Sequence, residues 1–230
     1  MKSSSLHARV VDAVGARIVA GDLAPGETFT VRELEEEFGI SRSVAREVVR
    51  VMESLGLVAS RTRVGCTVQE AWLWNALSPQ VIRWQMRGPW RALSLGSLVE
   101  LRAGVEPVAA RLAARRASWN QVQVMVDAAA RMTDLGHEDR GTDPGFLEAD
   151  ITFHEALLLA TGNPAYAALV PTVIACLRER SEAGLTPARP AEVNLTNHSE
   201  LALAIGRRDE DAAERLARAI VTVVSDETHH

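Results

Sequence analysis

The chain has 230 residues, 47% of them hydrophobic and 24% charged, and a formal net charge of −5. This composition excludes collagen-like, disordered and disulfide-stapled proteins. The two cysteines, Cys66 and Cys176, lie far apart and have no cysteine or histidine at metal-ligand spacing, so neither a disulfide framework nor a zinc finger is expected. Charged residues interrupt every apolar run, and the N-terminus lacks an apolar signal core. We therefore expect a cytoplasmic protein with no membrane contact.

The first 70 residues predict three helices followed by a β-hairpin. Apolar residues at helical spacing indicate the helices, and two short β-compatible runs indicate the hairpin. A capping box of Thr30 and Glu33 opens the second helix, and Ser41 caps the third. The five elements are expected at residues 5–21, 31–38, 42–55, 57–60 and 66–69.

The rest of the chain predicts a connector and then an all-helical domain. Tryptophans gather between residues 70 and 90, which indicates an ordered connector packed against its neighbours. Beyond it the apolar period is helical, with glycine and proline interruptions that divide it into about six helices. We predict a mainly α protein with a first domain over residues 1–70, a connector over 71–78 and a helical bundle over 79–230.

Charge is distributed unevenly within the first domain. The overall negative charge argues against a protein that coats nucleic acid without selectivity, but a local basic surface is compatible with reading one DNA site. Between residues 42 and 63 there are two acids, Glu47 and Glu53, and five arginines. The arginines are Arg42, Arg46, Arg50, Arg61 and Arg63.

The second and third helices have the proportions of a helix-turn-helix. In that motif the second helix lies in the major groove and presents its first turn to base edges. Arginine can bind guanine bidentately, and serine hydroxyls and helix N-termini can hold phosphates. An alternative is a generic helical hairpin with a solvated charged face. The side chains of that first turn belong to Ser41, Arg42, Ser43 and Arg46.

The hairpin favours DNA binding over a generic helical hairpin. It would form a wing with Arg61 and Arg63 at its tip and Gly65 in its turn. Cations at this place lie beside the DNA backbone or in the minor groove. A helix pair, a recognition turn and a basic wing in this order are together typical of a winged helix-turn-helix.

Residues 6–69 resemble the winged helix-turn-helix of the GntR family of bacterial transcription regulators. The motifs that carry the resemblance are GDLAPG at 21–26, REL at 32–34, SRSVARE at 41–47 and LGLV at 55–58. The resemblance implies that Arg32, Arg42 and Arg46 contact DNA, with help from Ser41, Ser43 and Gly65. The wing departs from the family pattern, which usually has a glycine where this chain has Arg63.

The helical domain contains a candidate metal site. Asp150 and His154 are four residues apart in a predicted helix, so both project from one face, and His198 could add a third ligand from a facing helix. Imidazole and carboxylate suit Zn, Ni or Mn, and three protein ligands leave positions open for water or an oxygen-rich molecule. The alternative for Asp150 and His154 is an ordinary ion pair.

The helical domain resembles the C-terminal effector domain, of the FCD type, of the FadR-like subfamily. The motifs lie at residues 100–102, 105–107, 150–154, 162–164, 198 and 201–205. The resemblance supports the metal site and implies that Arg102 binds the carboxylate of an effector. From the residues alone, Arg102 could equally form a surface ion pair with Glu106. Members with a full metal set have one more histidine in the last helix, where this chain has Ile220.

A narrower resemblance links the chain to repressors of D-galactonate catabolism in this subfamily. It is carried by Trp74, Asn75, Leu77, Val81, Trp84 and residues 148–150. The tryptophans could equally be a hydrophobic plug between two domains. A sugar acid would suit a site in which an arginine binds the carboxylate and hydroxyls reach a metal.

Together these features predict a homodimeric, ligand-responsive DNA-binding transcription regulator. We expect it to repress a catabolic operon at a double-stranded operator and to be released by a small carboxylate such as a sugar acid. The alternative is a metal-dependent enzyme that uses the Asp/His/His site to activate water. The enzyme is disfavoured because no separate acid or base with an obvious partner is found.

Overall fold

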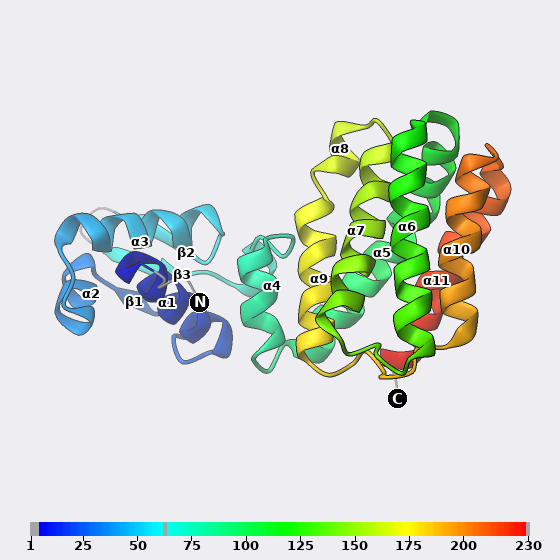
Figure 1. The fold of residues 1–230 in the computed structure, drawn as a ribbon. Coiled ribbons are helices and arrows are strands. Elements are labelled where there is room, and N and C mark those ends of the chain that lie inside the picture. The colour runs from blue at the N-terminus through cyan, green and yellow to red at the C-terminus, as the bar shows by residue number, and fades with distance from the viewer. Residues whose placement is uncertain (1–4, 62–63, 229–230) are drawn as a thin grey trace. The chain divides into compact units, whose positions relative to one another are not determined.

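The computed structural model describes residues 5–61 and 64–228, and the chain divides into two compact units, residues 1–91 and 92–230 (Figure 1). The first unit is a winged helix-turn-helix. Its helices are α1 (Leu6–Ala20), α2 (Val31–Phe38), α3 (Arg42–Ser54) and α4 (Pro79–Met86), and a 3-10 turn covers Ala71–Leu73. Its strands are β1 (Thr28–Phe29), β2 (Val58–Arg61) and β3 (Gly65–Val68).

Local capping fixes the ends of α2 and α3. Thr30 and Glu33 form the predicted capping box, and Gly39 ends α2 in the left-handed conformation, which glycine adopts at little cost. Ser41 caps α3 by accepting a hydrogen bond from the backbone N–H of Val44. Two capped helices joined by a tight turn are the predicted helix-turn-helix.

The wing is a three-stranded antiparallel sheet in the order β1-β3-β2. β3 pairs with β2 through Ser60 and Cys66 and with β1 through Thr28 and Thr67. The hairpin was predicted, but β1 was not, because its two residues are strand only through pairing with the distant β3. Arg63, expected at the wing tip, lies outside the described residues.

Helix α4 belongs to the first unit, whereas the sequence analysis placed residues from 79 onward in the second domain. Val81 and Trp84 of α4 are buried in the same core as the valines of α1. The indole Nε1 of Trp84 donates a 2.7 Å hydrogen bond to Asp12 Oδ1. The apolar face of α4 therefore packs against α1, and the first unit extends to Arg91.

The second unit is a helical bundle. Helix α6 packs against α7 and α10, α7 against α9, and α10 against α11 (Figure 1). The fold class predicted for the whole chain, mainly α, is confirmed. No helix within the described ranges is long and apolar enough to cross a bilayer. The helices are α5 (Arg91–Arg116), α6 (Trp119–His137), α7 (Pro144–Ala160), α8 (Pro164–Ala167), α9 (Val170–Glu182), α10 (Glu192–Gly206) and α11 (Glu210–Thr228).

The packing of α4 on α1 predicts a cost for any side chain at Gly15. A Cβ there would lie 2.2–2.5 Å from three carbon atoms of the Trp84 indole, so Gly15→Ala must displace a buried ring. We expect a loss of about 1–3 kcal/mol in the free energy of unfolding, measured by urea denaturation. Gly104→Ala is the control, because its Cβ meets nothing within 4 Å and alanine favours the helix. Equal stability of both variants would contradict this packing.

Candidate functional site

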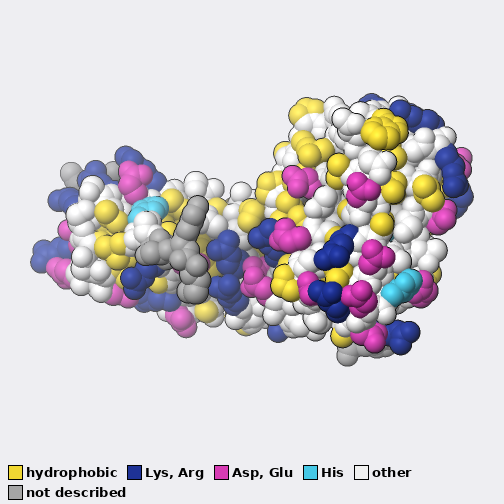
Figure 2. Space-filling view, viewed as in Figure 1, with side chains coloured by type: hydrophobic (Ala, Val, Ile, Leu, Met, Phe, Trp, Pro, Cys, Tyr) yellow, Lys and Arg dark blue, Asp and Glu magenta, His cyan; other side chains and the backbone are white. Residues whose placement is uncertain are grey.

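The first turn of α3 presents two arginines to solvent. Its apolar residues, spaced three and four apart, turn one face into the core. Arg42 and Arg46 therefore lie on the exposed face. Beside them the Ser41 and Ser43 hydroxyls are 2.9 Å apart. Figure 2 shows Lys and Arg side chains on the surface of this unit.

The arginines of the first unit differ in their partners. Arg32 binds Glu36 at 2.8 Å, with its side chain 83% exposed, and Arg50 binds Glu47. Over residues 5–61 and 64–228 the structure shows no ion pair for Arg42 or Arg46. Exposed ion pairs contribute little and are easily exchanged, so all these guanidinium groups remain accessible to a phosphate or a base.

Gly65, which was expected in the turn of the wing, also makes a close backbone approach that the sequence analysis did not identify. It opens β3 with a φ of +102°, and a Cβ there would lie 2.7 Å from the carbonyl oxygen of Phe29. A side chain would therefore push β1 off the sheet. This close approach accounts for the glycine whether or not its backbone contacts DNA.

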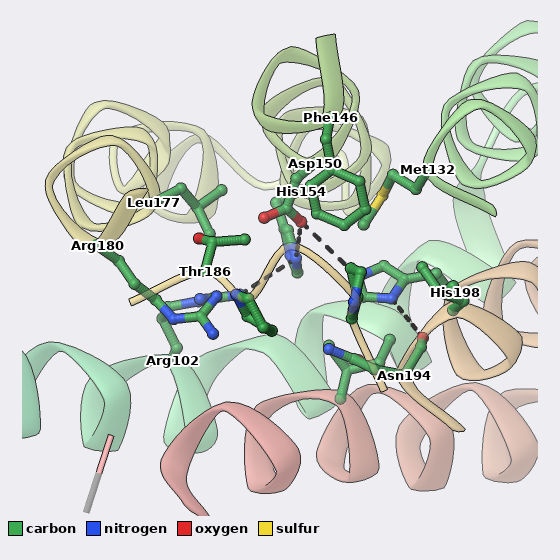
Figure 3. Close-up of a pocket in the computed structure, with 14 residues that line it drawn as sticks. Arg102, Met132, Phe146, Asp150, His154, Leu177, Arg180, Thr186, Asn194 and His198 are labelled. Atoms are coloured by element: carbon green, nitrogen blue, oxygen red, sulfur yellow. Dashed lines mark hydrogen bonds and ion pairs between the residues drawn. The ribbon is translucent and has the colours of Figure 1, made fainter. Parts of the chain in front are cut away.

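The candidate metal ligands come together in the second unit. Asp150 and His154 project from α7 and His198 from α10 (Figure 3). Asp150 Oδ1 lies 3.2 Å from His154 Nε2 and 3.8 Å from His198 Nε2. One ligand atom of each lies within 4.8 Å of the others, a separation that a single ion could bridge. This group could bind a metal.

His198 is prepared to act as a metal ligand. Its Nδ1 donates a 2.8 Å hydrogen bond to the carbonyl of Asn194, which leaves the lone pair of Nε2 pointing toward Asp150. Burial lowers the pKa of His198 to about 4, so the ring is neutral at pH 7. Nε2 is buried and has no hydrogen-bond partner among the described residues, and an ion there would satisfy it.

The charges of the other two ligands depend on their neighbours. Burial disfavours the cationic form of His154, but the Glu106 and Asp150 carboxylates together outweigh burial and raise the pKa of His154 to about 9. Burial also disfavours ionised Asp150, but the hydrogen bond and charge of His154 lower its pKa to about 2. A metal ion at His154 Nε2 therefore has to displace a proton.

Arg102 pairs with Glu106, and the pair is buried instead of lying on the surface. The side chains are 2% and 1% exposed, and Arg102 Nε donates to Glu106 Oε1 at 2.6 Å. Arg102 Nη2 also lies 3.2 Å from His154 Nε2. The ion-pair alternative is thus correct in its partner and wrong in its location, and Arg102 still lines the cavity that holds the metal-ligand group.

The cavity has polar walls that spacing in the sequence could not reveal. Arg180 on α9, Thr186 after it and Asn194 on α10 line it together with Arg102 (Figure 3). They come from separate segments and meet only through the packing of the bundle. Ile220 of α11 also lines the cavity, so the position of the family's extra histidine is apolar.

Comparison with known families settles the class of protein. Residues 6–68 match the family described as bacterial regulatory proteins, gntR family, and residues 97–222 match the FCD domain. The chain belongs to the GntR family of bacterial transcription regulators. The galactonate operon transcriptional repressor of Escherichia coli is 32% identical to it over 217 residues, 93% of this chain and 92% of that protein.

Solved structures support the same fold at lower identity. The structure of Lar, which controls the expression of the Listeria monocytogenes agr system, has a TM-score of 0.64 at 16% identity and covers 100% of this chain and 99% of its own. Streptococcus agalactiae GntR has a TM-score of 0.50 at 22% identity, covering 96% and 99%. The family matches, and not these structures, make the chain a DNA-binding transcription regulator and not an enzyme, which overrules the alternative of a metal-dependent enzyme that uses the Asp/His/His site.

The geometry of the metal-ligand group predicts the effect of removing one ligand. His198→Ala leaves two of three ligands, so we expect it to abolish stoichiometric binding of Ni²⁺ or Zn²⁺ in isothermal titration calorimetry. His137→Ala is the control, because the His137 side chain is 57% exposed and contacts Glu192, and it should bind like the unmodified protein. A His198→Ala protein with unchanged metal affinity would remove His198 from the site.

Proposed function

We propose that the protein is a homodimeric repressor of a catabolic operon, released from its operator by a small carboxylate such as a sugar acid. The observation that carries the proposal is the burial of Arg102 beside three metal-ligating side chains in one cavity. A guanidinium group and an adjacent metal position suit a ligand that has a carboxylate and hydroxyl groups. The name of the E. coli relative, a galactonate operon repressor, supports the same class of effector.

On the DNA side, the recognition helix α3 would enter the major groove. Arg42 and Arg46 are exposed on its first turn and would bind bases, while the hydroxyls of Ser41 and Ser43 would hold phosphate. Arg32 would contact the backbone from α2, and Gly65 would let the wing approach the duplex. One unit reads only a few base pairs, so a dimer on a palindromic site would double the contacts.

In the proposed effector site, the Nη1 atom of the Arg102 guanidinium group can bind a ligand. Its Nε and Nη2 bind Glu106, whereas Nη1 is buried without a hydrogen-bond partner among the described residues. A ligand carboxylate would supply that partner. Zn, Ni or Mn at Asp150, His154 and His198 would supply a Lewis acid for hydroxyl or carboxylate oxygens. Because Ile220 contributes no ligand, positions on the ion stay open.

The size of the cavity ties effector binding to a change in the bundle. The enclosed space is about 20 Å³, which is room for about one water molecule. A sugar acid therefore requires the wall to move, and the segment of Thr186, Pro187 and Pro190 between α9 and α10 is part of that wall. Differential affinity of the ligand for an opened bundle would then shift the equilibrium that sets operator affinity.

Recognition by Arg46 is tested by two substitutions. Arg46→Ala should weaken binding to DNA upstream of the chain's own gene by about 1–3 kcal/mol, measured by fluorescence anisotropy. Arg46→Lys keeps the charge but loses the planar fork, so we expect it to keep binding to unrelated DNA and to lose discrimination. Wild-type affinity and discrimination in both variants would exclude Arg46 from base contacts.

The role of Arg102 is tested by Arg102→Lys, which keeps a cation beside buried Glu106 but removes the fork. We expect the variant to bind operator DNA normally and to need at least about tenfold more D-galactonate, the first probe, for release, since the lost hydrogen bond from Nη1 to a charged carboxylate is worth about 1.5–3 kcal/mol. Arg178→Lys is the matched control on an exposed arginine of the same unit. Release at an unchanged concentration would refute the assignment, and a wider panel of hydroxy acids covers the case in which galactonate is not the effector.

A further inference from the structure

Glu106 occupies a place in the site that neither the metal-ligand group nor the cavity accounts for. Its side chain is 1% exposed on α5, and it is not one of the residues that line the cavity. It pairs with Arg102 and His154, which do line the cavity. A buried carboxylate is costly unless its charge is paired and hydrogen-bonded, and the ion-pair partners of Glu106 among the described residues both belong to the site.

The two carboxylate oxygens of Glu106 contact both Arg102 and His154. Oε1 accepts a 2.6 Å hydrogen bond from Arg102 Nε, and Oε2 lies 3.3 Å from Arg102 Nη2. Oε2 also lies 3.2 Å from His154 Nδ1. A single carboxylate therefore contacts both the guanidinium group assigned to the effector and the imidazole assigned to the metal.

We propose that Glu106 is the positioning residue that couples metal binding to effector binding. This inference rests on the proposed function. Glu106 Oε2 lies 3.2 Å from His154 Nδ1 and would keep that nitrogen protonated when a metal ion replaces the proton on Nε2, the atom that faces Asp150. By holding the Nε and Nη2 edge of Arg102, Glu106 directs Nη1 to the ligand.

Charge gives Glu106 a second part in the coupling. Arg102 Nη2 lies 3.2 Å from His154 Nε2, so the guanidinium cation is next to the place of a divalent cation. The two would repel each other strongly in a buried site. The negative charge of Glu106 offsets that repulsion. The same carboxylate thus allows a metal ion and Arg102 to bind one effector molecule side by side.

The test compares Glu106→Gln with the unmodified full-length protein, with Co²⁺ and Ni²⁺ as probes. The substitution keeps the size and removes the charge, so we expect a 10- to 100-fold loss of metal affinity, measured by calorimetry and by the visible absorption of bound Co²⁺. Ala113→Gly is the control for stability, because Ala113 is buried on the same helix, does not line the cavity, and glycine weakens the helix. It should leave metal affinity unchanged.

The outcomes separate this inference from the proposed function. A folded Glu106→Gln protein with wild-type metal affinity overturns the role of Glu106 while the metal site stands. An unmodified protein that binds neither ion overturns both. If Glu106→Gln does not fold, two measurements remain. Glu106→Asp should retain part of the affinity, and ¹⁵N NMR of the metal-loaded protein should show His154 protonated at Nδ1. Metal bound through Nδ1 contradicts the proposal.

Discussion

The burial of ionisable groups in the helical bundle is the constraint on which the site depends. Arg102, Glu106, His154 and His198 are all nearly inaccessible to solvent. Removing one charge from such a group leaves another uncompensated, at a typical cost of about 3–5 kcal/mol. A buried cluster of charges contributes little net folding stability, since apolar residues of the same volume would stabilise the bundle as well. Beside it lies an apolar core rich in alanine and leucine, and the proposed ligand binding would account for the presence of the cluster.

Arginine side chains are exposed on α3 in the first unit, whereas Arg102 is buried in the second. In the first, capping and an apolar helix face fix α3 so that arginines are left on its surface, where screening by water keeps them exchangeable. In the second, the same residue type is enclosed and held by a carboxylate, so its remaining donor is oriented before a ligand arrives. Under the proposed function, arginine would bind a polyanion in one unit and a small anion in the other.

Local signals made the first unit predictable from the sequence. Thr30 with Glu33, and Ser41, mark helix starts within a few residues, and two short β-compatible runs on either side of a turn indicate the hairpin. The strand β1 was missed because pairing with β3 creates it, and α4 was assigned to the second domain because its partner, Gly15, lies far back in the chain.

In the second unit, the four-residue spacing of Asp150 and His154 predicted that the two side chains meet. A surface ion pair of Arg102 and Glu106 stayed open as an alternative, because nothing in their spacing reveals which face of α5 is enclosed, and no local signal pointed to Arg180.

The central claim is that a metal-assisted carboxylate site in the bundle controls DNA binding. The most direct measurement follows the anisotropy of labelled operator DNA while a series of aldonates is added to protein loaded with Ni²⁺ or stripped by a chelator. The account predicts that at least one acid releases the DNA from the loaded protein and that the stripped protein needs a much higher concentration. Equal release from both preparations, or none with any acid and metal, would contradict it.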